Sequence, residues 1–577
     1  MLTKTFSFLV TALLCQSPLS AQSIVGPGRA VNPYNFSIHK NHTYQKGAVA
    51  SAHPLASLVG AAILKQGGNA VDAAIAVQLT LAVVYPGAGN IGGGGFMVAR
   101  MKDNKSFTLD YRETAPAKAS RDMYLDKNGN AQTNLSQYGH LASGIPGTVS
   151  GLFASMKYAN LPFKTLIQPS IDLAEKGFTL TKSEAAKLNN TQDAFKKYNT
   201  VMPVFVKASA WKAGDTLVQK ELANTLKRIR DKGAAGFYEG ETAKLLVEEM
   251  QRGNGLVTLE DLKSYKTKER KPLQFNYKGY TVISMPPPSS GGILLWQMLK
   301  MVEKRPLVSY GFETAKSVQL MTEAERRAFA DRAQHMGDPD FWKVPVATLT
   351  SDTYLAKRMA DYDSTKAGKS TGIQAGIIES METTHISIID RWGNMVSVTT
   401  TLNGNFGSKT IVAGAGFLLN NEMDDFSIKP GVPNMYGAVG GEANAIAPGK
   451  RMLSSMTPTI VLKGDRPFMV AGTPGGTTIP TSVYQTIVNV IDFKMSANDA
   501  VNKPKFHHQW LPDEIVTEKG FPEKVIHELE AMGYVIKDYN VKGYSVDQIG
   551  RVELIKVTNG KLEAVADGRG DDAVAGF

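Results

Sequence analysis

The segment 383–403 constrains the fold more than any other part of the 577-residue chain. Its two halves, TTHISIID and MVSVTTTLN, alternate polar and apolar residues as half-buried strands do, and the Gly-Asn pair between them favours a turn. We therefore predict a β-hairpin. If Asp390 pairs near Met395, Thr383 lies opposite residues 401–403. Two threonine hydroxyls and an amide would then meet at the open end of the hairpin.

A polar stretch containing Gly and Ser precedes this hairpin at 350–382 and suits an exposed linker. A linker that ends where a strand begins is a suitable place for chain cleavage. Threonine needs an adjacent base to act as a nucleophile, and the α-amine of an N-terminal threonine can be that base. Thr383 could therefore attack the carbonyl of Glu382 and be released as a new N-terminus. The hairpin alone leaves open that Thr383 and Thr384 simply begin a strand.

The N-terminus has the layout of a secretory signal peptide. Lys4 is followed by an apolar stretch from Phe6 to Cys15 and by small residues around Ala21, and the stretch is too short to anchor the chain in a bilayer. We expect residues 1–21 to be removed and the protein to be secreted. The only cysteine lies in this segment, so the mature chain would have neither disulfides nor Cys-ligated metal.

The composition is that of a globular protein, with 43% hydrophobic and 20% charged residues. The net charge of +11 raises the question of nucleic-acid binding. The sequence contains no long Lys/Arg run and no basic stripe with interleaved aromatic residues, so no nucleic-acid partner is expected. It also contains no further apolar run of membrane-spanning length, so we expect a soluble mature chain without a membrane anchor.

Hydrophobic periodicity outlines the remaining organisation. Two apolar helices are predicted at 52–66 and 70–84, with a Gly-Gly-Asn break between them. A hairpin is predicted over 95–111. The region from about 147 to 330 is mixed and largely helical, and the chain after residue 382 is rich in strands.

Ordered motifs along nearly the whole mature chain resemble the γ-glutamyltranspeptidase family of N-terminal-nucleophile hydrolases. They are GGNAVDAA (67–74), GNIGGGGFM (89–97), DYRETAPAKA (110–119), MPPPSSGG (285–292), GDPDF (337–341), TTHISIID (383–390), LLNNEMDDFS (418–427), PGVPNMYGAVGG (430–441), RMLSSMTPT (451–459), GTPGG (472–476) and FHHQW (506–510). The resemblance implies an α/β fold, a four-layer αββα sandwich with two central sheets. It also implies self-cleavage into a large subunit (22–382) and a small subunit (383–577) that stay associated as a heterodimer.

The resemblance assigns catalytic roles to residues of these motifs. Thr383 corresponds to the nucleophile, and Thr401 would hydrogen-bond to it and assist cleavage. Gly475 and Gly476 would form the oxyanion hole, where backbone N–H groups stabilise the tetrahedral intermediate. Many bacterial relatives have Gln at the position of Glu382, but only its carbonyl carbon is attacked, so cleavage should still occur.

The resemblance also assigns a binding site for a free glutamyl head group. Arg112, with Ser454 and Ser455, would bind the α-carboxylate. Asp425, with Asn403 and Glu422, would bind the α-ammonium. Tyr436 would belong to a lid that excludes bulky acyl donors. No metal or cofactor is expected.

The implied activity is that of a γ-glutamyltransferase and glutathione hydrolase in the periplasm or outside the cell. Small γ-glutamyl amides resembling glutathione would donate the acyl group, and water or an amine would accept it. One alternative is a cephalosporin or glutaryl acylase, or a poly-γ-glutamate-processing enzyme, of the same fold. Another is a non-catalytic binding protein of the cell envelope.

Other short patterns have simpler explanations. Residues 87–92 fit GxGxxG, but a strand rather than a helix is predicted next, so we expect a tight turn under the active site and no dinucleotide site. His507 and His508 would face opposite sides of a strand, which favours packing or hydrogen bonding over metal binding. The Arg-Gly-Asp tripeptide at 569–571 is ascribed to chance. Asp424, beside Asp425, is expected to be structural rather than half of an acid/base pair.

Overall fold

The computed structural model describes residues 31–370, 383–435, 437–538 and 548–577. The predicted signal peptide (1–21), the residue before the predicted cut (Glu382) and the predicted lid residue Tyr436 lie outside these ranges.

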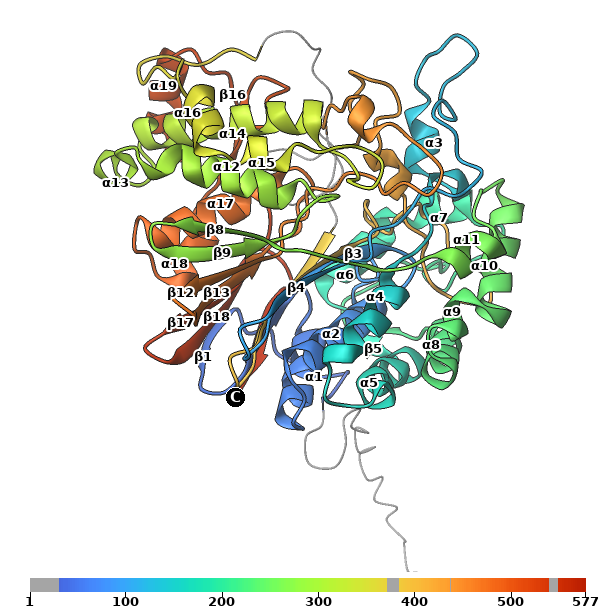
Figure 1. The fold of residues 1–577 in the computed structure, drawn as a ribbon. Coiled ribbons are helices and arrows are strands. Elements are labelled where there is room, and N and C mark those ends of the chain that lie inside the picture. The colour runs from blue at the N-terminus through green and yellow to red at the C-terminus, as the bar shows by residue number, and fades with distance from the viewer. Residues whose placement is uncertain (1–30, 371–382, 436, 539–547) are drawn as a thin grey trace, which may run out of the picture.

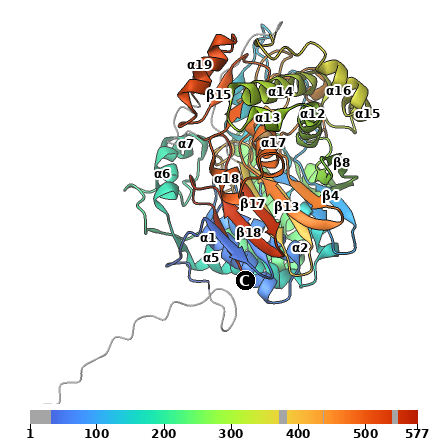
Figure 2. The same cartoon turned by 90° about the vertical axis from the view of Figure 1, so that its left-hand side faces the viewer.

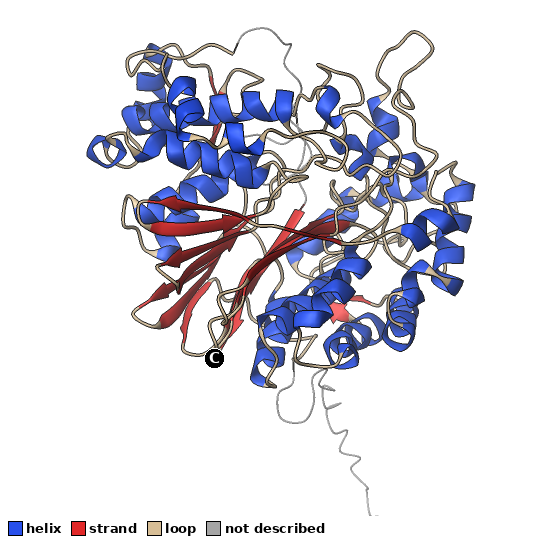
Figure 3. Cartoon of the chain, viewed as in Figure 1, coloured by secondary structure: helices blue, strands red, loops and turns tan. Residues whose placement is uncertain are grey.

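Two seven-stranded antiparallel sheets stack at the centre of the molecule (Figures 1 and 3). The first sheet has the order β1 (Asn41–Tyr44), β18 (Lys561–Ala566), β17 (Glu553–Thr558), β13 (Arg466–Gly472), β12 (Thr459–Lys463), β9 (Tyr280–Ser284) and β8 (Leu273–Tyr277). The second has the order β19 (Ala573–Gly576), β2 (Ala48–Ser51), β10 (Thr383–Ile389), β11 (Met395–Thr401), β3 (Gly94–Arg100), β4 (Ser106–Asp110) and β7 (Lys268–Arg270).

Helices cover the outer face of each sheet. Against the second sheet lie α1 (Pro54–Lys65), α2 (Ala70–Val84), α5 (Phe163–Lys176) and α8 (Lys220–Lys232), whose apolar side chains form one core with that sheet. Against the first sheet lie α12 (Gly291–Glu303), α14 (Ala315–His335) and α17 (Thr478–Ile491), which form a second core. Figure 2 shows these layers from the side. The predicted αββα sandwich is confirmed.

Further helices and strands complete the described chain. The helices are α3 (Thr133–Gln137), α4 (Thr148–Ser155), α6 (Lys182–Asn190), α7 (Gln192–Tyr198), α9 (Ala235–Tyr238), α10 (Gly240–Arg252), α11 (Leu259–Ser264), α13 (Leu307–Tyr310), α15 (Val346–Leu349), α16 (Asp352–Arg358), α18 (Ala497–Asn502) and α19 (Glu523–Ala531). The short strands are β5 (Phe178–Thr179), β6 (Thr216–Leu217), β14 (Phe506–His507), β15 (Ile515–Thr517) and β16 (Ile536–Asp538). The predicted helical character of 147–330 is confirmed.

The predicted hairpin at 383–403 is present as β10 and β11, with Thr383 paired to Thr401 and Ile389 to Met395. Both strands are completely buried, whereas the alternation predicted strands buried on one face only. The central apolar residues Ile386, Ile388, Val396 and Val398 pack into the core that includes the helices. Ser387 and Ser397 face the other sheet and donate to Glu553 O (2.9 Å) and Ala471 O (3.3 Å). The polar side chains are tolerated there because they hydrogen-bond to one another and to the backbone, as His385 Nδ1 does to Thr399 Oγ1 (2.9 Å). Burial lowers the pKa of His385 to about 3, so its ring is neutral.

The expectation of a linker over 350–382 is wrong for its first part, which is exposed but structured. Residues 352–358 form α16, and the chain after this helix is hydrogen-bonded to the body of the protein. Gln319 Nε2 donates to Asp363 O (2.7 Å), Ala367 N to Met532 O (2.8 Å) and Ser370 N to Asp513 Oδ2 (2.6 Å). Most side chains of this part are exposed or half-buried, as expected, but the backbone is fixed by these hydrogen bonds and does not form a free linker.

The glycine-rich turn at 87–92 packs under β11, as predicted. Strand β3 follows it directly, so no helix is present to bind a dinucleotide phosphate. A Cβ atom on Gly93 would lie 2.1 Å from Thr401 O, which shows how closely the two backbones approach. Asn90 Nδ2 donates to the same oxygen (2.8 Å) and joins the turn to the end of the hairpin.

Candidate active site

Thr383 is the first residue of β10, at the open end of the hairpin and on the wall of a pocket. Its cross-strand partner Thr401 ends β11, and Thr401 Oγ1 accepts a hydrogen bond from Asn403 N (2.7 Å). Thr401 and Asn403 line the same pocket. Sequence periodicity thus predicted the spatial grouping of these three residues.

A Gly-Gly turn at the start of α17 forms another wall. Gly475 and Gly476 have φ values of +143° and +53°, which glycine adopts far more readily than other residues. Both the backbone N and the Oγ1 of Thr478 donate to Gly475 O (2.9 and 2.8 Å) and fix the turn. Gly476 lines the pocket with Thr383. Free N–H groups at a helix N-terminus stabilise nearby negative charge, so this turn can stabilise an oxyanion.

The FHHQW segment supports this turn from behind. Thr477 Oγ1 donates to Gln509 Oε1 (2.6 Å), which is 3.0 Å from His507 Nε2. The other ring nitrogen of His507 is 2.8 Å from Thr481 Oγ1 in the first turn of α17. Burial lowers the pKa of His507 to about 4. Both ring nitrogens of His507 therefore have hydrogen-bond partners, as expected from the sequence. Within the described ranges no group of three His, Cys, Asp or Glu side chains is placed to hold a metal ion.

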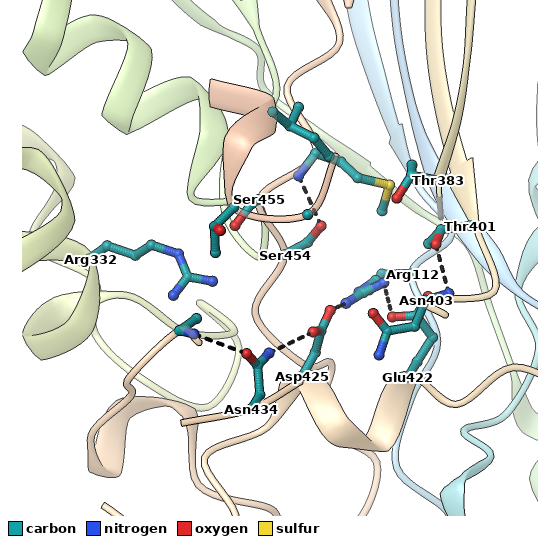
Figure 4. Close-up of a pocket in the computed structure, with 15 residues that line it drawn as sticks. Arg112, Arg332, Thr383, Thr401, Asn403, Glu422, Asp425, Asn434, Ser454 and Ser455 are labelled. Atoms are coloured by element: carbon teal, nitrogen blue, oxygen red, sulfur yellow. Dashed lines mark hydrogen bonds and ion pairs between the residues drawn. The ribbon is translucent and has the colours of Figure 1, made fainter. Parts of the chain in front are cut away.

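Arg112 lies at the centre of the pocket's charged side and is fully buried. It follows β4, and its backbone N donates to Asp110 Oδ1 (3.0 Å). Its Nη1 forms an ion pair with Glu422, and its Nη2 forms one with Asp425 (Figure 4). A third carboxylate, Glu113, lies 3.5 Å from Nη1. One arginine is therefore shared among three acidic side chains.

These acids are strongly perturbed by their surroundings. Burial raises the pKa of Glu422 well above its ordinary value and also raises that of Asp425, while Arg112 opposes both shifts. Burial likewise raises the pKa of Glu113 to about 8. Perturbed acids around a buried arginine are typical of a functional site. Such a site suits a ligand that carries both a cation and an anion.

Ser454 and Ser455 form the wall facing these charges (Figure 4). Ser454 O accepts hydrogen bonds from the backbone N and the Oγ of Ser290 (both 2.8 Å), so the segment is held at the start of α12. Ser454 Oγ accepts from Met456 N (3.1 Å). Both serines lie within the pocket that also contains Thr383 and Arg112.

Comparison with known proteins identifies the family. The model of the Gamma-glutamyltranspeptidase family matches residues 56–577. The chain belongs to the γ-glutamyltranspeptidase family. It is 46% identical over 542 residues to a glutathione hydrolase proenzyme of Escherichia coli (strain K12), covering 92% of each chain. It is also 46% identical to the glutathione hydrolase proenzyme of Pseudomonas aeruginosa PAO1, covering 92% of this chain and 94% of that one.

A solved structure shows the same fold. The cephalosporin acylase from Bacillus halodurans superposes with a TM-score of 0.82 at 27% identity, covering 94% of this chain and 98% of the acylase. The fold is therefore common to γ-glutamyltranspeptidases and to an acylase of lower sequence similarity. Fold alone does not separate the two activities, so the side chains of the pocket must do so.

The structure brings together nine of the residues that the family motifs singled out. Thr383, Thr401, Asn403, Arg112, Glu422, Asp425, Ser454, Ser455 and Gly476 all line one pocket, and Gly475 directly precedes Gly476. Of the predicted lid, Asn434 and Ala438 also line the pocket, and Asn434 Nδ2 donates to Asp425 Oδ1 (3.1 Å). Asp424 points elsewhere and accepts from Ser136 Oγ (2.5 Å) and Met435 N (2.8 Å).

Sequence reasoning missed several lining residues, namely Arg332, Asn434, Ala438, Met456, Thr477 and Ile479. Asn434 and Thr477 lie inside or next to motifs of the γ-glutamyltranspeptidase family and could have been proposed from them. Arg332 lies in a charged helix five residues before the GDPDF motif. Its helix has the polar composition of a surface helix, so no signal in the sequence placed it in the pocket.

Proposed function

We propose that the protein is a γ-glutamyltransferase and glutathione hydrolase made from a self-cleaving precursor. The observation that carries the proposal is the pocket itself, because Thr383 and Gly476 share it with Arg112 and Asp425. A nucleophile and an oxyanion site thus lie beside groups of opposite charge that fit a zwitterionic glutamyl head. The family relatives named as glutathione hydrolase proenzymes agree with this substrate class.

The precursor would be cleaved by the residue that later performs catalysis. Thr383 Oγ attacks the carbonyl carbon of Glu382, the peptide C–N bond breaks, and the nitrogen takes up a proton to become the α-amine of Thr383. Water then hydrolyses the resulting ester and restores the hydroxyl. The products are a large subunit of residues 22–382, after loss of 1–21, and a small subunit of residues 383–577.

The new α-amine then serves as the general base. It accepts the hydroxyl proton as Thr383 Oγ attacks the γ-glutamyl carbonyl, and its pKa of roughly 7.7–8.0 leaves a useful neutral fraction at physiological pH. The backbone N–H groups at Gly475 and Gly476 stabilise the oxyanion. The leaving amine departs with the proton, and the γ-glutamyl ester passes to water or to the amine of an acceptor.

Donor binding would replace ion pairs that the protein makes with itself. The α-carboxylate of the donor binds to Arg112, assisted by Ser454 and Ser455. The α-ammonium binds to Asp425 and Glu422, with Asn403 beside them. The carboxylate of the donor replaces the acids as the partner of Arg112, and its ammonium replaces Arg112 as the partner of the acids. Each buried charge therefore keeps a partner of opposite sign.

The first test uses N-terminal sequencing, denaturing electrophoresis and a glutathione assay. We expect fragments of about 361 and 195 residues, counted from the proposed cut sites. The smaller fragment should begin at Thr383, and the processed protein should release glutamate from glutathione. Thr383→Ala should remain uncut and inactive, because both steps need the hydroxyl. A wild-type protein that stays full length would contradict the mechanism and favour a non-catalytic binding protein.

The structural similarity to a cephalosporin acylase supports acylase activity as the alternative function. A glutaryl donor lacks the α-ammonium and would leave Asp425 and Glu422 without the cation that they are placed to bind. We therefore expect cleavage of γ-glutamyl p-nitroanilide and little cleavage of glutaryl p-nitroanilide. The reverse preference would identify an acylase.

We also propose that the protein acts in the periplasm or outside the cell, on the basis of the signal-peptide pattern in residues 1–21. Across the described ranges, no helix is long and apolar enough to cross a membrane.

A further inference from the structure

Arg332 is a cation of the candidate active-site pocket that has no role in the proposed self-cleavage and γ-glutamyl transfer. It lies in the last turn of α14, is 7% exposed and lines the pocket with Thr383 and Asp425. Its Nε donates to Ser290 Oγ (3.1 Å). This is the only hydrogen bond or ion pair that its guanidinium makes with the part of the chain that the structure describes. Its two Nη groups have no protein partner there.

Such an arrangement is costly without a ligand. A guanidinium has five N–H donors, and a buried one needs an anion or several acceptors to offset its desolvation. Burial lowers the pKa of Arg332 to about 10, and the nearby Asp425 carboxylate counters that shift only in part. Figure 4 shows the guanidinium between Ser455 and Asn434, facing the pocket. The Nη groups of Arg332 are therefore available to an anion that enters the pocket.

The neighbours of Arg112 indicate which anion Arg332 would bind. Arg112 already faces Glu422, Asp425 and Glu113. A zwitterionic donor leaves the net charge of the pocket unchanged, but its carboxylate must either share Arg112 with these acids or bind a second cation. Arg332 is such a cation, because it lines the same pocket near Ser455.

We propose that Arg332 is a second cation for the α-carboxylate of the γ-glutamyl donor, acting together with Arg112, Ser454 and Ser455. This inference rests on the proposed function. Arg332 also fixes the serine wall, because Ser290 Oγ accepts from Arg332 Nε and donates to Ser454 O. Arg332 thus contributes to selectivity for donors that carry a free α-carboxylate.

The test compares four variants after electrophoresis has verified complete cleavage. Arg332→Gln removes the charge, Arg332→Lys keeps it without the planar fork, and Ser290→Ala removes only the hydroxyl link. Arg305→Gln is the matched control, because Arg305 donates to Met359 O (3.2 Å) and lies outside the pocket. The readouts are kcat and KM for γ-glutamyl p-nitroanilide and the inhibition constants of L-glutamate and γ-aminobutyrate, which lacks the α-carboxylate.

We expect Arg332→Gln to raise KM and the inhibition constant of L-glutamate at least ~10-fold while changing kcat less than ~3-fold. The inhibition constant of γ-aminobutyrate should stay within ~2-fold, because this compound lacks the α-carboxylate that Arg332 would bind and keeps only the carboxylate that corresponds to the γ-carboxylate of glutamate. Arg332→Lys should give a smaller rise in KM and Ser290→Ala a rise of ~3-fold or less, with Arg305→Gln unchanged. If Arg332→Gln does not cleave itself, the two inhibition constants are compared in Arg332→Lys instead.

Three results would overturn the inference. They are a KM for Arg332→Gln close to that of the wild type, an equal weakening of both inhibitors, and a loss in Ser290→Ala as large as in Arg332→Gln. The last two results would mean that Arg332 only positions the Ser454–Ser455 segment or affects Asp425, and does not bind the donor. A fully cleaved wild-type protein that releases no nitroaniline would instead contradict the proposed function.

Discussion

Two neighbouring carboxylates, Asp424 and Asp425, have different surroundings although they are adjacent in the chain. Asp425 points into the pocket and pairs with Arg112, whereas Asp424 points away and accepts from Ser136 Oγ and Met435 N. Burial raises the pKa of both. The two residues differ by one step along a short 3₁₀ turn, so their different directions follow from backbone geometry rather than from residue type.

This contrast gives a matched pair of variants. Asp425→Asn should lower kcat/KM for γ-glutamyl p-nitroanilide at least ~30-fold, because removing one side of a buried charge pair costs about 2–5 kcal/mol. Asp424→Asn should leave kcat within ~3-fold but lower the free energy of unfolding by about 1–3 kcal/mol, because one of its two acceptor bonds is lost. Steady-state kinetics and thermal unfolding measure the two effects. Equal kinetic losses in both variants would contradict the division of roles.

The Asp424 variant should also change how stability depends on pH. The pKa of Asp424 is raised to about 7 by burial, above the ordinary value of an unfolded aspartate. Between those two values the folded state holds a proton that the unfolded state has released, so the free energy of unfolding falls as pH rises. Asparagine does not titrate. The stability deficit of Asp424→Asn should therefore shrink between about pH 4 and about pH 7 and stay constant above that range, as differential scanning fluorimetry would show.

At the scale of elements, hydrophobic periodicity predicted the pairing of neighbouring strands. It did not predict the side-chain contacts between segments that are far apart in the sequence. The alternation after residue 382 placed Thr383 opposite Thr401, because strand pairing is local and has a period of two. Glu422 and Asp425, which pair with Arg112, lie more than three hundred residues further along the chain, and only family resemblance suggested them. Helix α14 shows that polar composition alone does not indicate exposure. Its sequence AERRAFADRAQH looks solvent-exposed, yet Glu325, Arg326 and Arg332 are buried in it.

The Gly-Gly turn before α17 is the element that we propose as the oxyanion site. A Cβ atom on Gly475 would lie 2.5 Å from Thr478 Oγ1, and its φ of +143° is unfavourable for alanine. Gly475→Ala should therefore displace the turn and lower kcat by ~10²–10³-fold with a smaller change in KM. Stopped-flow or steady-state release of nitroaniline measures this loss.

Gly464 is the control for strain alone. It lies in the turn between β12 and β13 with φ +61°, and a Cβ atom there would meet nothing within 4 Å. Gly464→Ala should cost ~1 kcal/mol of stability and leave kcat unchanged. An equal loss of kcat in the two variants would mean that general destabilisation, rather than the oxyanion turn, explains the effect of Gly475→Ala.

At the scale of the whole molecule, the proposed cut before Thr383 divides both sheets between two chains. In the second sheet, β10 and β19 of the small subunit pair with β2 of the large subunit, and β11 pairs with β3. In the first sheet, β12 pairs with β9 and β18 with β1. Neither fragment holds a complete sheet, so neither can bury its apolar faces alone. The cores on both sides of the sandwich also combine side chains from the two fragments.

This division predicts how the processed protein unfolds. The two fragments should separate only on unfolding, in one cooperative transition, so the denaturant midpoint should rise with protein concentration. The uncut Thr383→Ala precursor has the same sheets but one chain, and its midpoint should be independent of concentration. Urea titrations over a wide range of protein concentrations, followed by tryptophan fluorescence and by size-exclusion chromatography, make the comparison. A concentration-independent midpoint for the processed protein, or fragments that separate before unfolding, would show that one subunit folds without the other.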